Sequence, residues 1–214
     1  MARAYLQRAR EEVLGSYLLP LWTAIVISLA AGFALGATIA FARAVGWGVG
    51  GRLGALVQAH GHAQLMGWAG LFILGMAYRL VPRFTASSPV PPLPFFASFL
   101  ALGTGVMVRV IGQPLATGGV GKALLLVSGG LEATGAAIFA HQVGRRLWHR
   151  PGAPFTPHLT SMAWWLVVAK ALALAWAFDA QGMGPAVYPF GWNQALVTTE
   201  MVGFVLCAVI GVSL

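Results

Sequence analysis

The sequence has very few charged side chains, and this scarcity excludes most classes of soluble protein. Only 8% of its 214 residues are Asp, Glu, Lys or Arg, whereas a soluble domain carries about 25%. Hydrophobic residues make up 58% of the chain, and its mean hydropathy is +0.79. Apolar runs of about 20 residues are long enough to cross a bilayer. We therefore predict an all-α protein, a polytopic transmembrane helical bundle embedded in a lipid bilayer.

Cysteine and acidic residues are also scarce. The single cysteine, Cys207, excludes a disulfide framework, a zinc site built from cysteine pairs and a CxxCH site for covalent haem. Five acidic residues stand against thirteen Lys and Arg, which gives a net charge of +8. The basic residues are scattered between apolar runs instead of forming one face. Their excess therefore favours positive-inside membrane topology over a nucleic-acid partner.

Six apolar runs predict about six spans, within a transmembrane domain formed by residues 18–214. Residues 1–17 are predicted to form an interfacial segment. A cleavable signal peptide ending near residues 40–44 is the alternative for the first run, but the run is long and Glu11 and Glu12 do not suit its charged region. The predicted spans are residues 18–42, 56–81, 93–111, 123–143, 158–178 and 192–214.

The distribution of Lys and Arg predicts the orientation. With the N-terminus inside, the inner segments hold eight basic residues and the outer loops hold four. Cytoplasmic segments carry the excess of Lys and Arg. We therefore expect a multi-pass protein of a bacterial-type inner (plasma) membrane with a cytoplasmic N-terminus.

The second and sixth spans resemble each other. The segment 67–75 (GWAGLFILG) has the same glycine spacing and similar apolar filling as 203–211 (GFVLCAVIG). In that register Leu214 corresponds to Tyr78, which lies inside the second span. The resemblance predicts a duplicated architecture, with this sequence as the N-terminal part of a longer protein.

The second span carries polar residues that are costly in a membrane, namely His60, His62 and Gln64. Ionisable groups at membrane depth usually have a function. Two histidines two positions apart point to nearly opposite faces of a regular helix, so one metal ion cannot bind both. The face formed by His60, Gln64, Gly67, Leu71 and Gly75 is small enough to admit the edge of a porphyrin, and the face of His62 is typical of packing. The alternative is a hydrogen-bonded structural histidine near the lipid headgroups.

The stretch HGHAQLMGWAGLFILGMAYRLVPRF resembles the NnrS family and, more distantly, an early helix in the catalytic subunit of haem-copper oxidases and nitric oxide reductases. The resemblance implies a membrane protein that binds haem b, and copper as well, in nitric oxide response or related respiratory redox chemistry. It implies that His60 or His62 is the haem ligand. The copper-binding histidines and cross-linked tyrosine of true oxidases have no counterpart here, so oxidase catalysis is not expected.

Other residues complete the candidate haem and metal sites. For the second axial ligand of a haem iron, the third span offers Met107. Otherwise this ligand is absent, or it comes from a missing C-terminal half or from a partner subunit. Arg109 could pair with haem propionates or snorkel to the surface. His141 and His158 could form an inner metal site, although histidines at this position, flanked by arginines, more often contact headgroups.

Three charged residues are predicted to lie near mid-membrane on the last three spans: Glu132, Lys170 and Glu200. Unpaired charges there cost several kcal/mol, so Lys170 is expected to pair with one of the glutamates. These three residues would either form an ion pair that holds the helices together or act as a relay for protons or ions.

Two functions therefore stand against each other. The first is haem binding, with nitric oxide or oxygen as the ligand and with a redox partner or self-association. The second is a cofactor-free transporter or relay that uses Glu132, Lys170 and Glu200.

Overall fold

A computed structural model describes residues 17–48, 52–181 and 187–214. The predicted interfacial segment lies outside these residues, apart from Tyr17. The described residues form helices and no strands, and six helical stretches are long and apolar enough to cross a membrane. The predicted fold class is confirmed: this is an all-helical, multi-pass membrane protein.

Three of the six spans contain a π-helical segment, labelled η, in which hydrogen bonds run from i to i+5. The first span is α2 (Leu18–Ile27), η1 (Ser28–Phe33) and α3 (Ala34–Ala44). The second is α4 (Leu53–His62), η3 (Ala63–Gly70) and α5 (Leu71–Phe84). The next three are α6 (Pro92–Leu115), α7 (Gly119–Leu147) and α8 (Phe155–Asp179). The sixth is α9 (Phe190–Thr198), η4 (Thr199–Leu206) and α10 (Cys207–Ser213).

Most helices extend beyond their predicted ends. The loop between the fourth and fifth spans is shorter than predicted. The predicted spans end at residue 143 and begin at residue 158, whereas α7 continues to Leu147 and α8 begins at Phe155. Arginines in the last turn of α7 favour the helix, since cations stabilise its negative C-terminal end. Proline is tolerated in the first turn of a helix, where its missing N–H has no partner to lose, so Pro157 does not delay α8.

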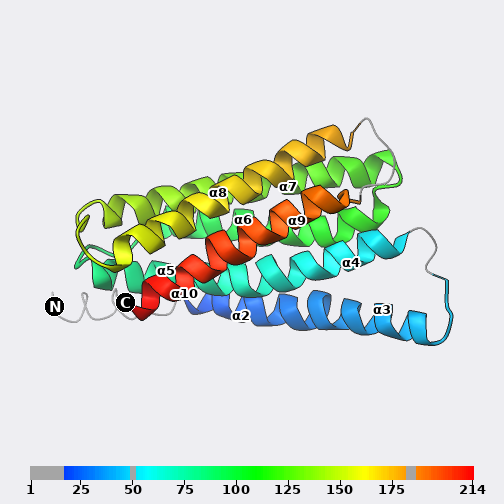
Figure 1. Ribbon diagram of the computed structural model, residues 1–214, viewed down its shortest axis with the longest axis horizontal. Helices are drawn as coiled ribbons and strands as arrows, with labels where there is room; N and C mark the ends of the chain where they lie inside the picture. The colour runs from blue at the N-terminus through cyan, green and yellow to red at the C-terminus, as the bar shows by residue number, and fades with distance from the viewer. Residues whose placement is uncertain (1–16, 49–51, 182–186) are drawn as a thin grey trace, which may run out of the picture.

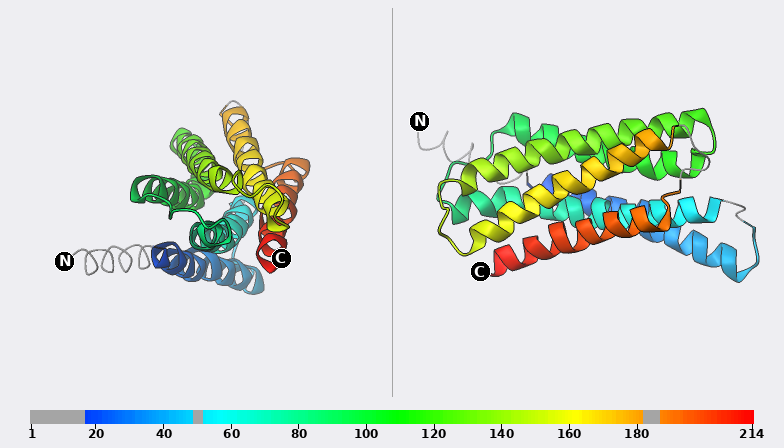
Figure 2. Two further views of the ribbon diagram at one scale, coloured as in Figure 1. Left: turned by 90° about the vertical axis from the view of Figure 1, so that its left-hand side faces the viewer. Right: turned by 45° about the horizontal axis from the view of Figure 1, so that its top comes forward.

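The second span lies at the centre of the bundle. It packs against the first span through α5 and η3, against α6 through α4, against α7 through α5, and against η4 through η3. Figure 1 shows the spans running along the long axis of the molecule, and the end-on view of Figure 2 shows the others gathered around the second. Of its most apolar window, 56% is buried, compared with 28% for the first span. Residues on the second span therefore face protein on several sides.

The predicted resemblance between the second and sixth spans extends to their backbone. The segments η3 and η4 are both eight residues long, and each position in η4 follows its counterpart in η3 by 136 residues. Helices resume at matching positions, Leu71 and Cys207. The glycine register read from the sequence is therefore the structural register as well.

The two spans also pack on their preceding helices in the same way. A Cβ added at Gly67 would collide with Ile27 of the first span, and one added at Gly203 would meet Trp165 of the fifth. Gly75 and Gly211 similarly face Leu21 and Leu159. In both cases the contacted residue of the fifth span follows that of the first span by 138 positions: Trp165 follows Ile27, and Leu159 follows Leu21. Spans one and two therefore form a helical hairpin that spans five and six repeat.

Candidate functional site: a buried charge cluster

The three mid-membrane charges meet in one place. Lys170 of α8 lies between the two glutamates, with its Nζ 2.8 Å from Glu132 Oε2 and 2.7 Å from Glu200 Oε1. Glu132 lies halfway along α7, and Glu200 lies in η4. The expected pairing of Lys170 is thus present with both partners rather than one.

His62 joins these charges. Its Nε2 lies 3.0 Å from Glu132 Oε1, and the Ser128 hydroxyl, one turn before Glu132, lies 3.1 Å from the same oxygen. We call His62, Glu132, Lys170 and Glu200 the charge cluster. The sequence analysis placed His62 on a packing face, whereas the structure makes it part of the polar centre of the bundle.

The charge cluster is almost completely shielded from solvent. The side chains of its four members are between 0% and 3% exposed. Burying ions costs several kcal/mol per ion unless they pair well, and here the two carboxylates share one ammonium. Glu132 Oε2 has no hydrogen-bond partner among the described residues, since its contact with Lys170 is an ion pair outside hydrogen-bond geometry. This oxygen retains lone pairs that could accept a proton.

The charge balance of the cluster depends on one proton. Two carboxylates and one ammonium leave a net charge of −1 when His62 is neutral and Glu132 is ionised. Addition of one proton to His62 or Glu132 brings the net charge to zero. A site whose net charge changes by one with a single proton, in a medium that penalises net charge, is suited to proton exchange.

Polar side chains continue from the charge cluster toward one end of the bundle. Arg109 of α6 is buried, its Nε donates to Gln113 Oε1 at 3.3 Å, and Gln113 Nε2 donates to Gln58 Oε1 at 2.8 Å. Gln58 holds the backbone of Tyr188 by two hydrogen bonds, of 3.0 and 2.8 Å. The Arg109 guanidinium lies 4.7 Å from the centre of the Tyr188 ring. We call this the Tyr188 end; the other end, where α7 meets α8, is the Arg146 end.

A small cavity lies along this polar route. Its volume is about 10 Å³, and its lining includes Arg109, Ser128, Trp176 and Tyr188. This approaches the volume that one water molecule needs. Trp176 stacks on Tyr188 with 3.7 Å between ring centres, and burial raises the pKa of the Tyr188 hydroxyl above its ordinary value. Tyr188 therefore stays a neutral donor between Arg109 and the bundle end.

The opposite half of the bundle interior is mainly apolar. Phe99, Leu102 and Phe139 are buried there, and a 2.6 Å hydrogen bond joins Tyr78 to Ser98. Among the described residues, no hydrogen bond or ion pair links that polar pair to the charge cluster. Within the described ranges, the polar side chains nearest to the cluster therefore lie on the side of the Tyr188 end, around the small cavity that Ser128, Arg109 and Tyr188 line.

His60 has a separate environment. Its Nδ1 lies 2.9 Å from the carbonyl oxygen of Gly32, and Gly36 leaves room for its ring. Gln64 accepts a 2.9 Å hydrogen bond from Ser28, which also belongs to the first span. His60 and His62 therefore contact the first and fourth spans respectively, in agreement with the opposite faces that their spacing predicted.

The small-residue face that was expected to admit a porphyrin is covered by the first span. Gly67 packs against Ile27, and Gly75 packs against Leu21 and Pro20. These contacts bring two helices close together, which is the usual role of small residues in membranes. In this arrangement the first span occupies the face that a porphyrin edge was expected to approach.

The remaining candidates are dispersed. Arg109 is 4% exposed and faces the interior, so the snorkelling alternative is wrong. His141 is exposed, His158 packs near Gly211, and Met107 lies against the main hydrophobic core. The described residues contain no group of three or more His, Cys, Asp or Glu side chains that could hold a metal.

Sequence reasoning missed the polar residues that connect the charge cluster with the Tyr188 end. Ser128 and Glu132 are four apart, as are Arg109 and Gln113, and such pairs lie on one helix face. Those spacings were the available signal. Gln58 and Tyr188 had none, because they meet across 130 residues of chain.

Comparisons with protein-family models, with curated proteins and with solved structures found no match to this chain.

Proposed function

We propose that this membrane protein exchanges protons between its buried charge cluster and the surface at the Tyr188 end. The main support is the position of Glu132, which contacts His62, Ser128 and Lys170 in the middle of the bundle and keeps one oxygen without a hydrogen-bond partner. Chains of Asp, Glu and His at membrane depth are typical of proton relays.

The proposed transfer takes place between His62 Nε2 and Glu132 Oε1. Their 3.0 Å separation is within the range for direct proton transfer. The proton leaves the imidazolium Nε2 and binds the carboxylate oxygen, or moves the opposite way. Lys170 stays protonated between Glu132 and Glu200 and offsets one negative charge in both states. Glu200 is thus a positioning residue that holds the ammonium.

The route between this pair and the surface uses the Tyr188 end. Ser128, the small cavity and Tyr188 lie between Glu132 and that end, and a single water in the cavity would connect the two hydroxyls. Arg109 stands beside the route with a positive charge.

We further propose that the Arg146 end faces the cytoplasm of a bacterial-type inner membrane, as the excess of Lys and Arg favours. The Tyr188 end is then the outer face, from which protons enter. Labelling of a cysteine introduced by Arg150→Cys, in a Cys207→Ser background, reads the orientation in cells. Labelling from the outer side would reverse the proposed direction.

Proton exchange can be measured in detergent-purified protein as the rate at which the infrared band of the Glu132 carboxyl responds to a pH jump. We expect His62→Gln to slow this response by about a hundredfold, the scale on which a positioned proton-transfer group acts. His60→Gln is the matched control, because it removes a histidine from the same helix that is outside the charge cluster. Equal rates in the two variants, or a Glu132 band in the wild type that does not respond to pH, would refute the relay.

A second candidate function is haem binding through His60. The carbonyl oxygen of Gly32 accepts a hydrogen bond from Nδ1 of His60, as metal-binding histidines commonly have at one ring nitrogen. The other nitrogen, Nε2, lies against Gly36 of the first span. Haem iron held in this way binds diatomic ligands such as nitric oxide or oxygen, or passes an electron. The fit is partial, because Gln64 and Gly67 pack against the first span and Met107 packs in the core.

Optical spectra test this second candidate. If the protein binds haem at His60, a Soret band is expected in protein expressed with haem supplied, lost in His60→Ala and retained in His62→Ala. Colourless wild-type protein, or a band that survives both substitutions, would count against it. A colourless protein in which Glu132 exchanges protons at the expected rate would leave the relay as the function.

A further inference from the structure

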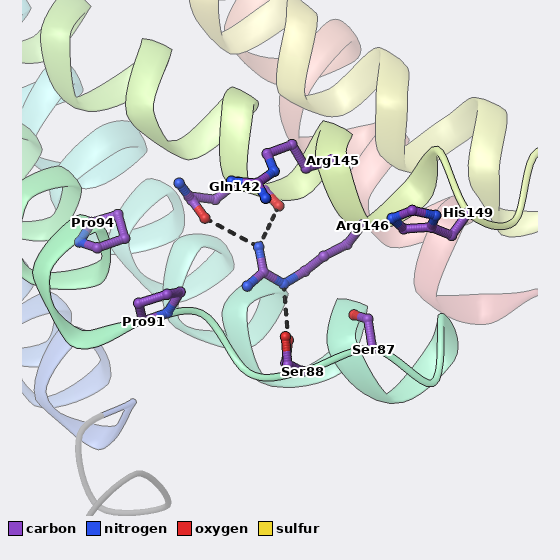
Figure 3. A pocket seen from close by; sticks show the side chains of 8 residues that line it. All are labelled: Ser87, Ser88, Pro91, Pro94, Gln142, Arg145, Arg146 and His149. Atoms are coloured by element: carbon purple, nitrogen blue, oxygen red, sulfur yellow. Dashed lines mark hydrogen bonds between the residues drawn. The ribbon is translucent and has the colours of Figure 1, made fainter.

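A second polar site lies at the Arg146 end, far from the charge cluster. A cavity of about 280 Å³ opens between the end of α7 and the connector before α6. Figure 3 shows the Arg146 guanidinium between these two elements, with Ser88 below it and His149 to one side. The residues that line the cavity are Ser87, Ser88, Pro91, Pro94, Gln142, Arg145, Arg146 and His149.

Arg146 is held firmly at this cavity. The residue is 8% exposed, and its guanidinium makes four hydrogen bonds of 2.8 to 3.2 Å. The acceptors are the backbone oxygens of Ser88, Pro89 and Gln142 and the side-chain oxygen of Gln142. Because a guanidinium has five N–H donors, one remains unused.

Among residues 17–48, 52–181 and 187–214, no carboxylate pairs with the positive charge of Arg146. All four acceptors are neutral, and none of the ion pairs found among the described residues includes Arg146. Arg145 and His149 add two more basic groups to the lining, which contains no Asp or Glu. A buried, oriented cation with basic neighbours and no carboxylate is a site that an anion would complete.

We propose that this cavity binds a phosphate group. Arg146 supplies the fixed charge and one free N–H, Arg145 and His149 close over the anion, and the Ser87 and Ser88 side chains supply hydroxyl donors. Arginine is suited to this task because its planar donors match the oxygens of phosphate. The cavity lies at one end of the spans, where the headgroup of an anionic phospholipid or a free phosphate-bearing solute could enter.

Two titrations of the detergent-purified full chain separate these sources. The first adds phosphatidylglycerol, with phosphatidylcholine as its control. The second adds inorganic phosphate, with chloride at the same ionic strength as its control. The melting temperature, followed by tryptophan fluorescence, is the readout, because a ligand that binds only the folded state raises it.

We expect one of the two probes to raise the melting temperature. The double variant Arg145→Gln and His149→Gln should need about tenfold more of that probe for half the effect, as the loss of a charge-assisted hydrogen bond predicts. Both side chains are exposed, and neither makes a hydrogen bond within the described ranges, so the variant keeps the fold.

Arg150→Gln is the matched control, since it removes an exposed arginine from the same end that does not line the cavity. It should respond as the wild type does. A response to phosphatidylglycerol alone identifies a lipid headgroup, and a response to inorganic phosphate identifies a soluble ligand. No response to either probe, or an equal loss in Arg150→Gln, would overturn the proposal. Neither result bears on the proton relay.

Discussion

Lys170→Met is expected to destabilise the protein by about 3–5 kcal/mol, the usual cost of breaking a buried ion pair by removing one partner. The substitution leaves Glu132 and Glu200 without their shared ammonium, at positions that are 1% and 2% exposed. The two carboxylates would then face each other as like charges in a medium that screens them poorly. Unfolding in detergent, followed by circular dichroism during heating or denaturant titration, measures the loss.

A second substitution separates charge from packing. Lys170→Met combined with Glu200→Gln restores the original net charge of the charge cluster, so the double variant should be more stable than Lys170→Met alone. Such non-additivity is expected for groups in direct contact. If Lys170→Met unfolds like the wild type, the cluster does not hold the helices together. If the double variant is the less stable of the two, the loss comes from packing.

Gly135→Ala should destabilise the protein by about 1–3 kcal/mol, the usual cost of overpacking. Gly135 lies where α7 crosses α6, and a Cβ there would come within 2.7 Å of Leu102 Cγ and 2.9 Å of the Ser98 carbonyl oxygen. Backbone atoms cannot move aside as a flexible side chain can. The two helices would therefore have to separate at this contact.

Gly130→Ala is the matched control on the same helix. Apart from the backbone of its own helix, nothing lies within 4 Å of a Cβ built at Gly130. Alanine favours a helix over glycine by roughly 0.5–1 kcal/mol. This variant should match or exceed the stability of the wild type. Thermal unfolding of the two variants in the same detergent makes the comparison. A similar loss in both would show that α6 and α7 are not as closely packed as described.

Much of the fold could be predicted because membrane spans depend on local composition. An apolar run long enough to cross the bilayer must form a helix, since no water is present to satisfy its backbone. The pairing of Lys170 followed from the same cost argument. The glycine register of the second and sixth spans was also readable, because close helix contacts require small residues at fixed intervals.

The rotation of each helix was harder to predict. The contact of His62 with Glu132 was not predicted, because a helix buried on several sides has no apolar stripe to orient it. The second span is of this kind, and η3 changes its twist immediately after His62. Gln58 and Tyr188 meet only when the second and sixth spans are folded together.

The repeated hairpin gives the charge cluster an internal reference. The 136-residue spacing of the second and sixth spans pairs Gln64 of the first copy with Glu200 of the second. The 138-residue spacing of the first and fifth spans pairs Gly32 with Lys170. The first copy is joined by neutral groups, whereas the second carries an ion pair, and its first helix, α8, is a continuous α-helix where the first copy has the π-helical η1. A tandem duplication followed by divergence would produce this asymmetry: one copy keeps the inherited packing, and the other is free to acquire charge.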